Sequence, residues 1–317
     1  RRGREAEVER IFEKWDLHAV AIGRVTADGL LRVRDRGAVV AEVPSRALAD
    51  EAPLYDRPAA PPADLAERRR IDWTALGTAP PPADALRRLL ASPAIASKRW
   101  VYRQYDHMVR TNTILPAGLG PGVVRVKGTR RALAVSAAGN GRYGWLDPRA
   151  GARLAVAEAA RNVACAGAVP IGVTDNLNFG NPERPEIMWQ LVEAIEGLRE
   201  ACLALELPVT GGNVSLYNET EGRAIYPTPI VGVLGLLEEA SRVTGRAFRE
   251  AGASIVLLGE GRGELGGSEY LKIVHGRVCG PPPALDLARE RALERLLVEG
   301  VGAGLVRSAH DVSDGGL

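Results

Sequence analysis

Cysteine, methionine and phenylalanine are scarce in this chain of 317 residues, with three, two and three copies. The cysteines, Cys165, Cys202 and Cys279, are far apart and odd in number, which fits neither a disulfide framework nor a zinc site with closely spaced thiols. No adjacent histidine or basic cluster is present to lower a thiol pKa. We therefore expect buried free thiols and no catalytic cysteine.

Long apolar runs and clusters of like charge are missing as well. No stretch of about 18 apolar residues suggests a membrane span, and residues 1–10 are charged where a secretory signal would be apolar. The net charge is +2 and the arginines are dispersed, so neither nucleic acid nor a membrane is an expected partner. With 46% apolar and 25% charged residues, the composition indicates a soluble globular protein of the cytoplasm.

Hydrophobic periodicity divides the N-terminal part into a small α+β unit and a linker. Apolar residues spaced three and four apart predict a helix within 5–17. The β-rich segments 18–25, 30–34 and 37–43, separated by turn residues, predict strands that include a hairpin. Residues 56–82 are crowded with proline, which disfavours both helix interiors and strand ladders, so they are predicted to be a linker or a surface excursion.

From residue 83 onward, helical and strand patterns alternate, which predicts an α/β domain whose helices cover a sheet. A third region begins near residue 247, and residues 314–317 resemble the opening of a helix whose body is absent, so we expect a chain truncated at its C-terminus. The predicted strands are 122–126, 132–136, 170–174, 209–215, 230–237 and 254–258, and the predicted helices are 84–90, 151–167, 185–205 and 285–299.

Common phosphate and nucleophile motifs are absent, including the Walker loop, the GxSxG elbow and HExxH. The polar segment 174–183 instead follows an apolar strand and precedes a helix, where α/β proteins place ligands. Its carboxylate, Asp175, and three amides could hold a nucleotide or hydrated magnesium. An asparagine-rich turn that satisfies its own backbone explains the same residues.

A second polar segment, residues 211–219, begins with two glycines that would let the main chain approach phosphates. Asn213 could be a neutral oxygen ligand for magnesium, and Ser215 could donate to a substrate oxygen. A simple strand-end turn is the alternative. If both segments are sites, we expect them to converge on one magnesium-bound phosphate group.

Three weaker candidates have equally simple structural explanations. Arg142 could pair with phosphate, but Asn140-Gly141 is also typical of a hairpin turn. Residues 308–316 could bind an anion at a helix start, or could merely cap the helix. His107 has no identifiable partner and is predicted to be a packing or hydrogen-bonding histidine.

Seven motifs occur in the order and approximate spacing of one enzyme family, the PurL-type formylglycinamide ribonucleotide amidotransferase synthetases, which the chain resembles over almost its whole length. Residues 50–55 also resemble the end of the first half of that family. The motifs are YRQYDHMV at 102–109, NGRYGWLDP at 140–148, EAARNVACAGA at 158–168, TDNLNFGNPERPE at 174–186, GGNVSLYNET at 211–220, YPTPIVGVLG at 226–235 and SAHDVSDGGL at 308–317.

The resemblance implies an α/β (α+β) fold of PurM-like domains, with a mixed sheet that forms half of a barrel and is covered by helices. It implies that residues 1–55 end the first-half C-terminal domain and that residues 56–82 are a linker. Residues 83–245 would be the barrel-forming domain of the second half, and residues 246–317 the start of its last domain.

The resemblance also implies an ATP- and magnesium-dependent carbon–nitrogen ligase of purine biosynthesis. ATP would phosphorylate the amide oxygen of formylglycinamide ribonucleotide, and glutamine-derived ammonia would displace the phosphate. Asp175 and Gly212 would contact ATP, Asn213 magnesium and Ser215 the substrate, and no catalytic residue is assigned. The implied partners are a separate glutaminase subunit, a small PurS-type subunit and the missing first half of the polypeptide.

Two departures from the family and two alternatives accompany this interpretation. The first-half histidine, lysine and magnesium carboxylates are missing, so we expect the isolated chain to be inactive. Ala137-Ala138 stands where many relatives have Thr-Asp, which puts any polar or metal role there in doubt. The alternatives are another ATP-dependent synthetase of the PurM superfamily, against which the long 174–186 segment argues, and a non-catalytic nucleotide-binding scaffold.

Overall fold

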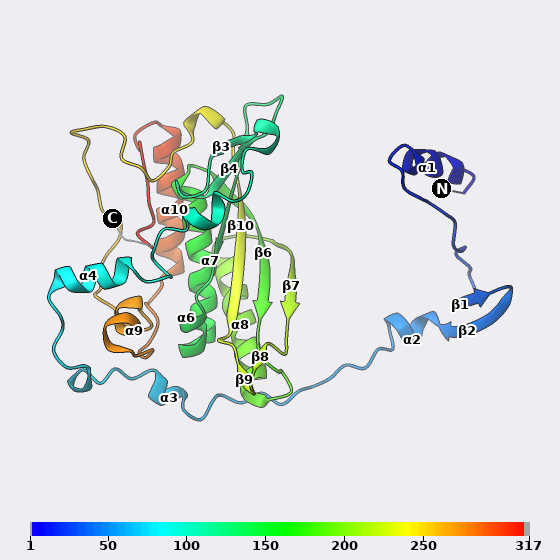
Figure 1. The fold of residues 1–317 in the computed structure, drawn as a ribbon, viewed down its shortest axis with the longest axis horizontal. Coiled ribbons are helices and arrows are strands. Elements are labelled where there is room, and N and C mark those ends of the chain that lie inside the picture. The colour runs from blue at the N-terminus through cyan, green and yellow to red at the C-terminus, as the bar shows by residue number, and fades with distance from the viewer. Residues whose placement is uncertain (1, 314–317) are drawn as a thin grey trace. The chain divides into compact units, whose positions relative to one another are not determined.

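The computed structural model describes residues 2–313, and the chain divides into two compact units, residues 1–56 and 57–317 (Figure 1). The finer division at residues 55, 82 and 245 stays a prediction. The first unit contains α1 (Glu5–Glu13), β1 (Leu30–Asp35), β2 (Ala38–Pro44) and α2 (Ser45–Ala49).

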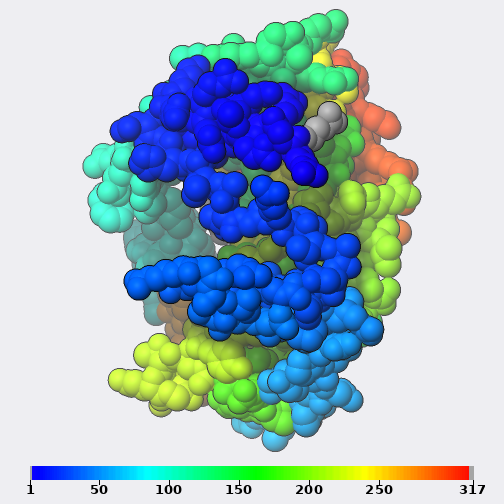
Figure 2. Space-filling view, turned by 90° about the vertical axis from the view of Figure 1, so that its right-hand side faces the viewer, coloured from blue at the N-terminus to red at the C-terminus, as the bar shows by residue number. Residues whose placement is uncertain are grey.

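The first unit confirms the predicted helix and hairpin. β1 and β2 pair antiparallel, and the two residues between them, Arg36 and Gly37, have φ values of 47° and 88°, as a two-residue hairpin turn requires. The predicted strand at 18–25 is wrong, because that segment pairs with no other strand of the described chain. None of residues 2–56 is buried; Figure 2 shows the surface of this unit in dark to mid blue.

The second unit is built around a six-stranded sheet in the order β3-β4-β5-β10-β6-β7, in which only the β6–β7 pair is parallel. Its strands are β3 (Thr113–Leu115), β4 (Gly122–Arg125), β5 (Ala132–Ala138), β6 (Val169–Asn178), β7 (Val209–Ser215) and β10 (Thr228–Leu237), beside the short pair β8 (Glu219–Thr220) and β9 (Arg223–Ala224). The sheet is open, with β3 and β7 at its edges.

Helices α7 (Pro148–Cys165) and α8 (Pro185–Ala204) cover one face of this sheet (Figure 1). Each begins with proline in its first turn, as predicted for α8, and Asp147 caps α7 by accepting from Ala150 N–H. The two helices pack closely: a Cβ at Gly197 would lie 2.2 Å from the carbonyl oxygen of Arg149. The predicted α/β class, with helices over a mixed sheet, is confirmed.

The remaining elements surround this two-layer body. They are α3 (Leu65–Arg68), η1 (Thr74–Leu76), α4 (Pro82–Leu90), α5 (Arg99–Tyr102), η2 (Val109–Thr111), α6 (Gly141–Leu146), η3 (Ala240–Arg242), α9 (Glu269–His275) and α10 (Leu287–Gly302). Helix α10 confirms the helix predicted at 285–299, whereas no strand forms at 254–258. Within residues 2–313, no helix is both long and apolar enough to span a bilayer.

The predicted burial of the cysteines holds for two of the three. Cys165 and Cys202 are buried and Cys279 is partly exposed, all with free thiols. Desolvation raises the pKa of Cys165 to about 12 and that of Cys202 to about 11. Since the thiolate is the nucleophile, these groups are unreactive at neutral pH.

Candidate functional site

The parallel strands β6 and β7 bring the two predicted polar segments side by side. In their register Asp175 is opposite Gly212, and Asn178 is opposite Ser215. The first segment was predicted to follow a strand that ends at residue 174, but β6 continues to Asn178. It continues because residues 174–178 are paired with β10 on one side and β7 on the other, so their backbone groups are satisfied in a ladder.

Strand alternation divides the site residues between the two faces of the sheet. Asp175 and Gly212 lie on the face of Leu177, which belongs to the core under the helices. Asn176 and Asn213 lie on the opposite face, where Nδ2 of Asn213 donates to Oδ1 of Asn176 over 3.1 Å. One ion therefore does not contact both Asp175 and Asn213 directly. A ligand reaches both only by crossing β7, the edge strand.

The Asp175 carboxylate lies directly over Gly212. A Cβ at position 212 would be 2.5 Å from Oδ1 of Asp175, so only glycine leaves room for the carboxylate there. Desolvation raises the pKa of Asp175, and within residues 2–313 its side chain has no hydrogen bond or ion pair. This carboxylate is a free acceptor that could receive hydrogen bonds from a nucleoside hydroxyl or amine.

On the other face, the available oxygens are neutral. Asn213 uses its Nδ2 in the bond to Asn176, so its Oδ1 is available to a cation. The Ser215 hydroxyl, by contrast, donates to Oδ1 of Asn218 over 3.3 Å. The described residues contain no group of three histidine, cysteine or acidic side chains able to hold a metal. Asn213 therefore fits magnesium only as one ligand of a larger set that includes substrate phosphates.

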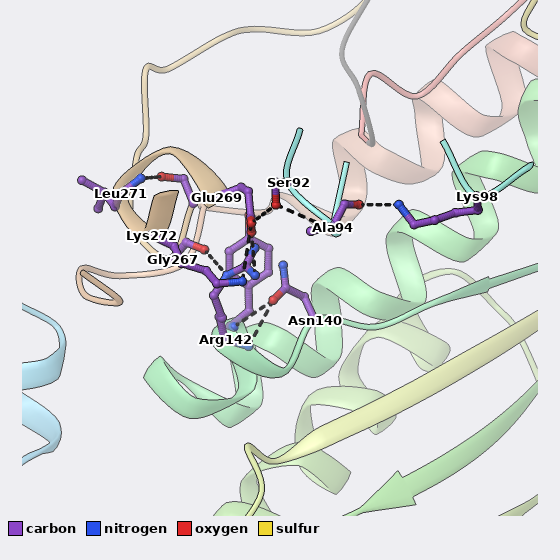
Figure 3. Close-up of polar contacts among 11 residues, drawn as sticks. Ser92, Ala94, Lys98, Asn140, Arg142, Gly267, Glu269, Leu271 and Lys272 are labelled. Atoms are coloured by element: carbon purple, nitrogen blue, oxygen red, sulfur yellow. Dashed lines mark hydrogen bonds and ion pairs between the residues drawn. The ribbon is translucent and has the colours of Figure 1, made fainter. Parts of the chain in front are cut away.

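Arg142 is not placed for phosphate binding, and Asn140-Gly141 does not form a hairpin turn. Asn140 is the N-cap of α6, and its Oδ1 accepts from Arg142 N–H over 3.1 Å. The Arg142 guanidinium forms an ion pair with Glu269 at 2.8 Å and donates to the carbonyl of Gly267 at 3.0 Å (Figure 3). The sequence around Arg142 could not reveal that its partner, Glu269, lies more than a hundred residues away.

The same network ties together three distant segments of the second unit. Ser92 is 3% exposed and donates to Glu269 over 2.5 Å, beside the ion pair with Arg142 (Figure 3). Burial opposes ionisation of Glu269, yet the hydrogen bond from Ser92 and the charges of Arg142 and Lys272 hold its pKa below the usual value. These contacts give the network a structural role, in which it fixes α9 against α6.

The remaining candidates lie elsewhere. His107 is exposed, with no partner for its ring among the described residues. Asp311 accepts from Asn162 on α7 over 3.0 Å, beside a hollow of about 500 Å³. The sequence interpretation missed Asn162, although its spacing of four from Glu158 places both on one helix face. Residues 314–316 of the 308–316 candidate lie outside the described residues.

Comparisons with known proteins agree with this fold. Residues 119–237 match the family described as AIR synthase related protein, N-terminal domain. The whole chain is 53% identical to the phosphoribosylformylglycinamidine synthase subunit PurL of Moorella thermoacetica and covers 43% of that protein.

Two solved structures extend the comparison. PurLQS from Thermotoga maritima aligns with 77% of this chain and 37% of its own, at 28% identity and a TM-score of 0.61. T. maritima PurL complexed with AMPPCP aligns with 98% of this chain and 45% of its own, at 24% identity and a TM-score of 0.65, which concerns the fold alone. The chain thus belongs to the PurL family of phosphoribosylformylglycinamidine synthase subunits, spanning less than half the length of its relatives.

Proposed function

We propose that the chain is part of a synthase that converts formylglycinamide ribonucleotide to formylglycinamidine ribonucleotide, using ATP and glutamine-derived ammonia in de novo purine biosynthesis. The 53% identity to the Moorella PurL subunit supports this activity. Because the chain spans 43% of that relative, the reaction requires the rest of the synthase. The isolated chain is expected to be inactive.

One feature of the fold supports the roles of the site residues: the β6–β7 register sets Asp175 against Gly212 and Asn176 against Asn213. Asp175 would accept hydrogen bonds from the nucleoside of ATP, with the main chain of Gly212 close to the nucleotide. Asn213, on the other face, would supply an oxygen to magnesium. When bound, magnesium would offset charge on the transferring phosphoryl group.

Ser215 would contact the substrate. It lies two residues beyond Asn213 on β7 and therefore on the same face of the sheet. Its hydroxyl is held by Asn218, whose Nδ2 in turn donates to the Ser215 carbonyl over 2.8 Å, so the serine is positioned before substrate binds. Ammonia would come from a separate glutaminase subunit in a complex with a small PurS-type subunit. This assembly would act in the cytoplasm.

A chimera tests these roles: the matched part of Moorella PurL is replaced by this chain, and turnover is measured with ammonia as donor. Asn213→Ala should raise the magnesium concentration for half-maximal rate about tenfold, whereas Asn213→Asp, which keeps an oxygen ligand, should not. Ser215→Ala should raise KM for formylglycinamide ribonucleotide roughly fivefold to tenfold, since a net hydrogen bond is worth about 1 kcal/mol.

Ser241→Ala is the matched control, because Ser241 is exposed in η3 and its hydroxyl bonds only to Glu239 among the described residues. Unchanged kinetics in both the Asn213→Ala and Ser215→Ala variants would instead support the non-catalytic scaffold. A chimera that uses a different ribonucleotide in place of formylglycinamide ribonucleotide would support another PurM-superfamily synthetase.

A further inference from the structure

A second hollow, of about 570 Å³, lies in the second unit apart from the four candidate site residues. Its walls are the proline-rich residues 60–64, α3, α6, the first turns of α8, and residues 222–226. In the lower part of Figure 2, the start of this unit, in light blue, lies beside the green to yellow-green segment around residues 180–226. Its volume is within the usual range for small-molecule sites.

Gln190 lines this cavity, and its side chain has no hydrogen-bond partner within residues 2–313. It is 5% exposed. Ile187, one helical turn earlier, is also buried and forms part of the same wall. The Gln190 amide is not among the fully buried polar atoms that lack a partner, so it is open to the cavity, where a ligand or water can bond to it. The amide offers both a donor and an acceptor to a molecule in the cavity.

Among the described residues, the charges that line the cavity leave one cation without an ion pair. Asp64 pairs with Arg68 at 2.6 Å, and Glu186 pairs with Arg184 at 2.6 Å. Arg223, on β9, has no ion pair within residues 2–313. Since the Glu186 carboxylate already lies at the start of α8, an anion would bind beside Arg223 and not at the helix N-terminus.

An aromatic surface completes the cavity. Tyr226 is 42% exposed, and its ring centroid is 5.4 Å from that of Trp145. The guanidinium of Arg68 lies 4.4 Å from the Trp145 centroid, which holds that ring in place. The exposed ring of Tyr226 is therefore available to stack on a planar group.

We propose that this cavity binds a nucleoside monophosphate. Gln190 hydrogen-bonds the edge of the base, Tyr226 stacks on its face and Arg223 pairs with the phosphate. A nucleobase combines the planar ring and the mixed donor and acceptor edge that these side chains match. The inference does not rest on the proposed synthase activity, because the two sites share no residue.

Calorimetric titration of the 317-residue chain with AMP tests the proposal. Arg223→Ala should weaken AMP binding about tenfold or more, since it removes a charge-assisted hydrogen bond. Gln190→Leu should weaken it to a similar degree. The affinity for adenosine should fall in Gln190→Leu but not in Arg223→Ala, because adenosine has no phosphate. The control Arg295→Ala, at an exposed arginine of α10, should bind AMP as the parent does, and Asp175→Ala reports whether AMP binds at the other site instead.

Thermal unfolding separates a ligand-binding role of Gln190 from a structural one. Because its amide bonds to no other group of residues 2–313, Gln190→Leu should unfold at the same temperature or higher while binding AMP more weakly. A structural glutamine would give a lower unfolding temperature. The proposal is overturned if AMP does not bind at millimolar concentration, or if Arg223→Ala and Gln190→Leu leave AMP binding unchanged. It is also overturned if Asp175→Ala abolishes AMP binding, or if inorganic phosphate competes as well as AMP does.

Discussion

At Gly212 the absence of a side chain determines where the Asp175 carboxylate lies. The carboxylate occupies the space that a Cβ at position 212 would need, and burial there raises the pKa of Asp175. Within residues 2–313 this carboxylate has no hydrogen bond or ion pair, and it lies on β6, next to the edge strand β7. Gly212 therefore contributes to the site through its lack of a side chain, which leaves space for the Asp175 carboxylate.

Gly212→Ala should disturb this pair without unfolding the strand. The added methyl group displaces the Asp175 carboxylate. In the Moorella chimera KM for ATP should therefore rise about tenfold, because ATP loses one hydrogen bond to a charged group. Gly122→Ala is a matched control on β4, because its Cβ would come no closer than 3.9 Å to the Val135 carbonyl. Equal KM values for the two variants would show that the Asp175 position does not matter for ATP.

The sequence predicted the site residues by type but not by face. Asn213 and Asp175 were identified from their polar segments, and both lie on the paired strands β6 and β7. Their opposite orientation depends on β6 continuing through residues 174–178. Local composition favoured a turn there, and only the two neighbouring strands, which are distant in sequence, stabilise the extended form.

At the level of elements, the contact between α7 and α10 contains an unusual buried acid. Arg161 of α7 forms two hydrogen bonds, of 2.6 and 2.9 Å, with Glu290 of α10. Glu294, one turn later, is 6% exposed, and its Oε1 has no partner within the described residues. Desolvation, with the charge of Glu290, raises the pKa of Glu294 to about 8, against the smaller opposing effect of Arg161.

This acid should make the stability of the chain depend on pH. The folded state keeps the proton of Glu294 up to about pH 8, whereas the unfolded state releases it near the ordinary value of 4.5. Stability therefore falls as pH rises from about 4.5 to 8, by up to about 1.4 kcal/mol per pH unit. Glu294→Gln, which cannot ionise, should remove this slope and be more stable than the parent at pH 8.

Urea unfolding at several pH values between 5 and 8 measures the effect. Glu299→Gln, at an exposed carboxylate of the same helix, should retain the slope of the parent. A parent and a Glu294→Gln variant with the same slope would show that Glu294 is ionised in the folded chain.

Helices were predicted more reliably than isolated strands, for a physical reason. Helix α8 satisfies its backbone internally, and Pro185 marks its start in the sequence. The apolar segment 254–258 has strong β propensity, yet it has no neighbouring strand among the described residues, and Ile255 is 70% exposed. A strand needs a partner that its own sequence does not encode.

At the scale of the whole molecule, the second unit supplies an open six-stranded sheet whose edge strand β7 carries three of the four candidate site residues. The barrel of which this sheet is predicted to form half requires a second sheet. The sequence motifs predicted the family, because they span the whole chain. They could not predict that Asp175 and Asn213 lie on opposite faces of the sheet.

We infer that Asp175 and Asn213 serve different parts of one nucleotide that crosses β7. Calorimetric titration of the Moorella chimera with AMPPCP, with and without magnesium, tests this arrangement. Asp175→Ala should weaken binding about tenfold in both conditions, and Asn213→Ala should weaken it only when magnesium is present. The same magnesium dependence in both variants, or no loss in either, would contradict the account.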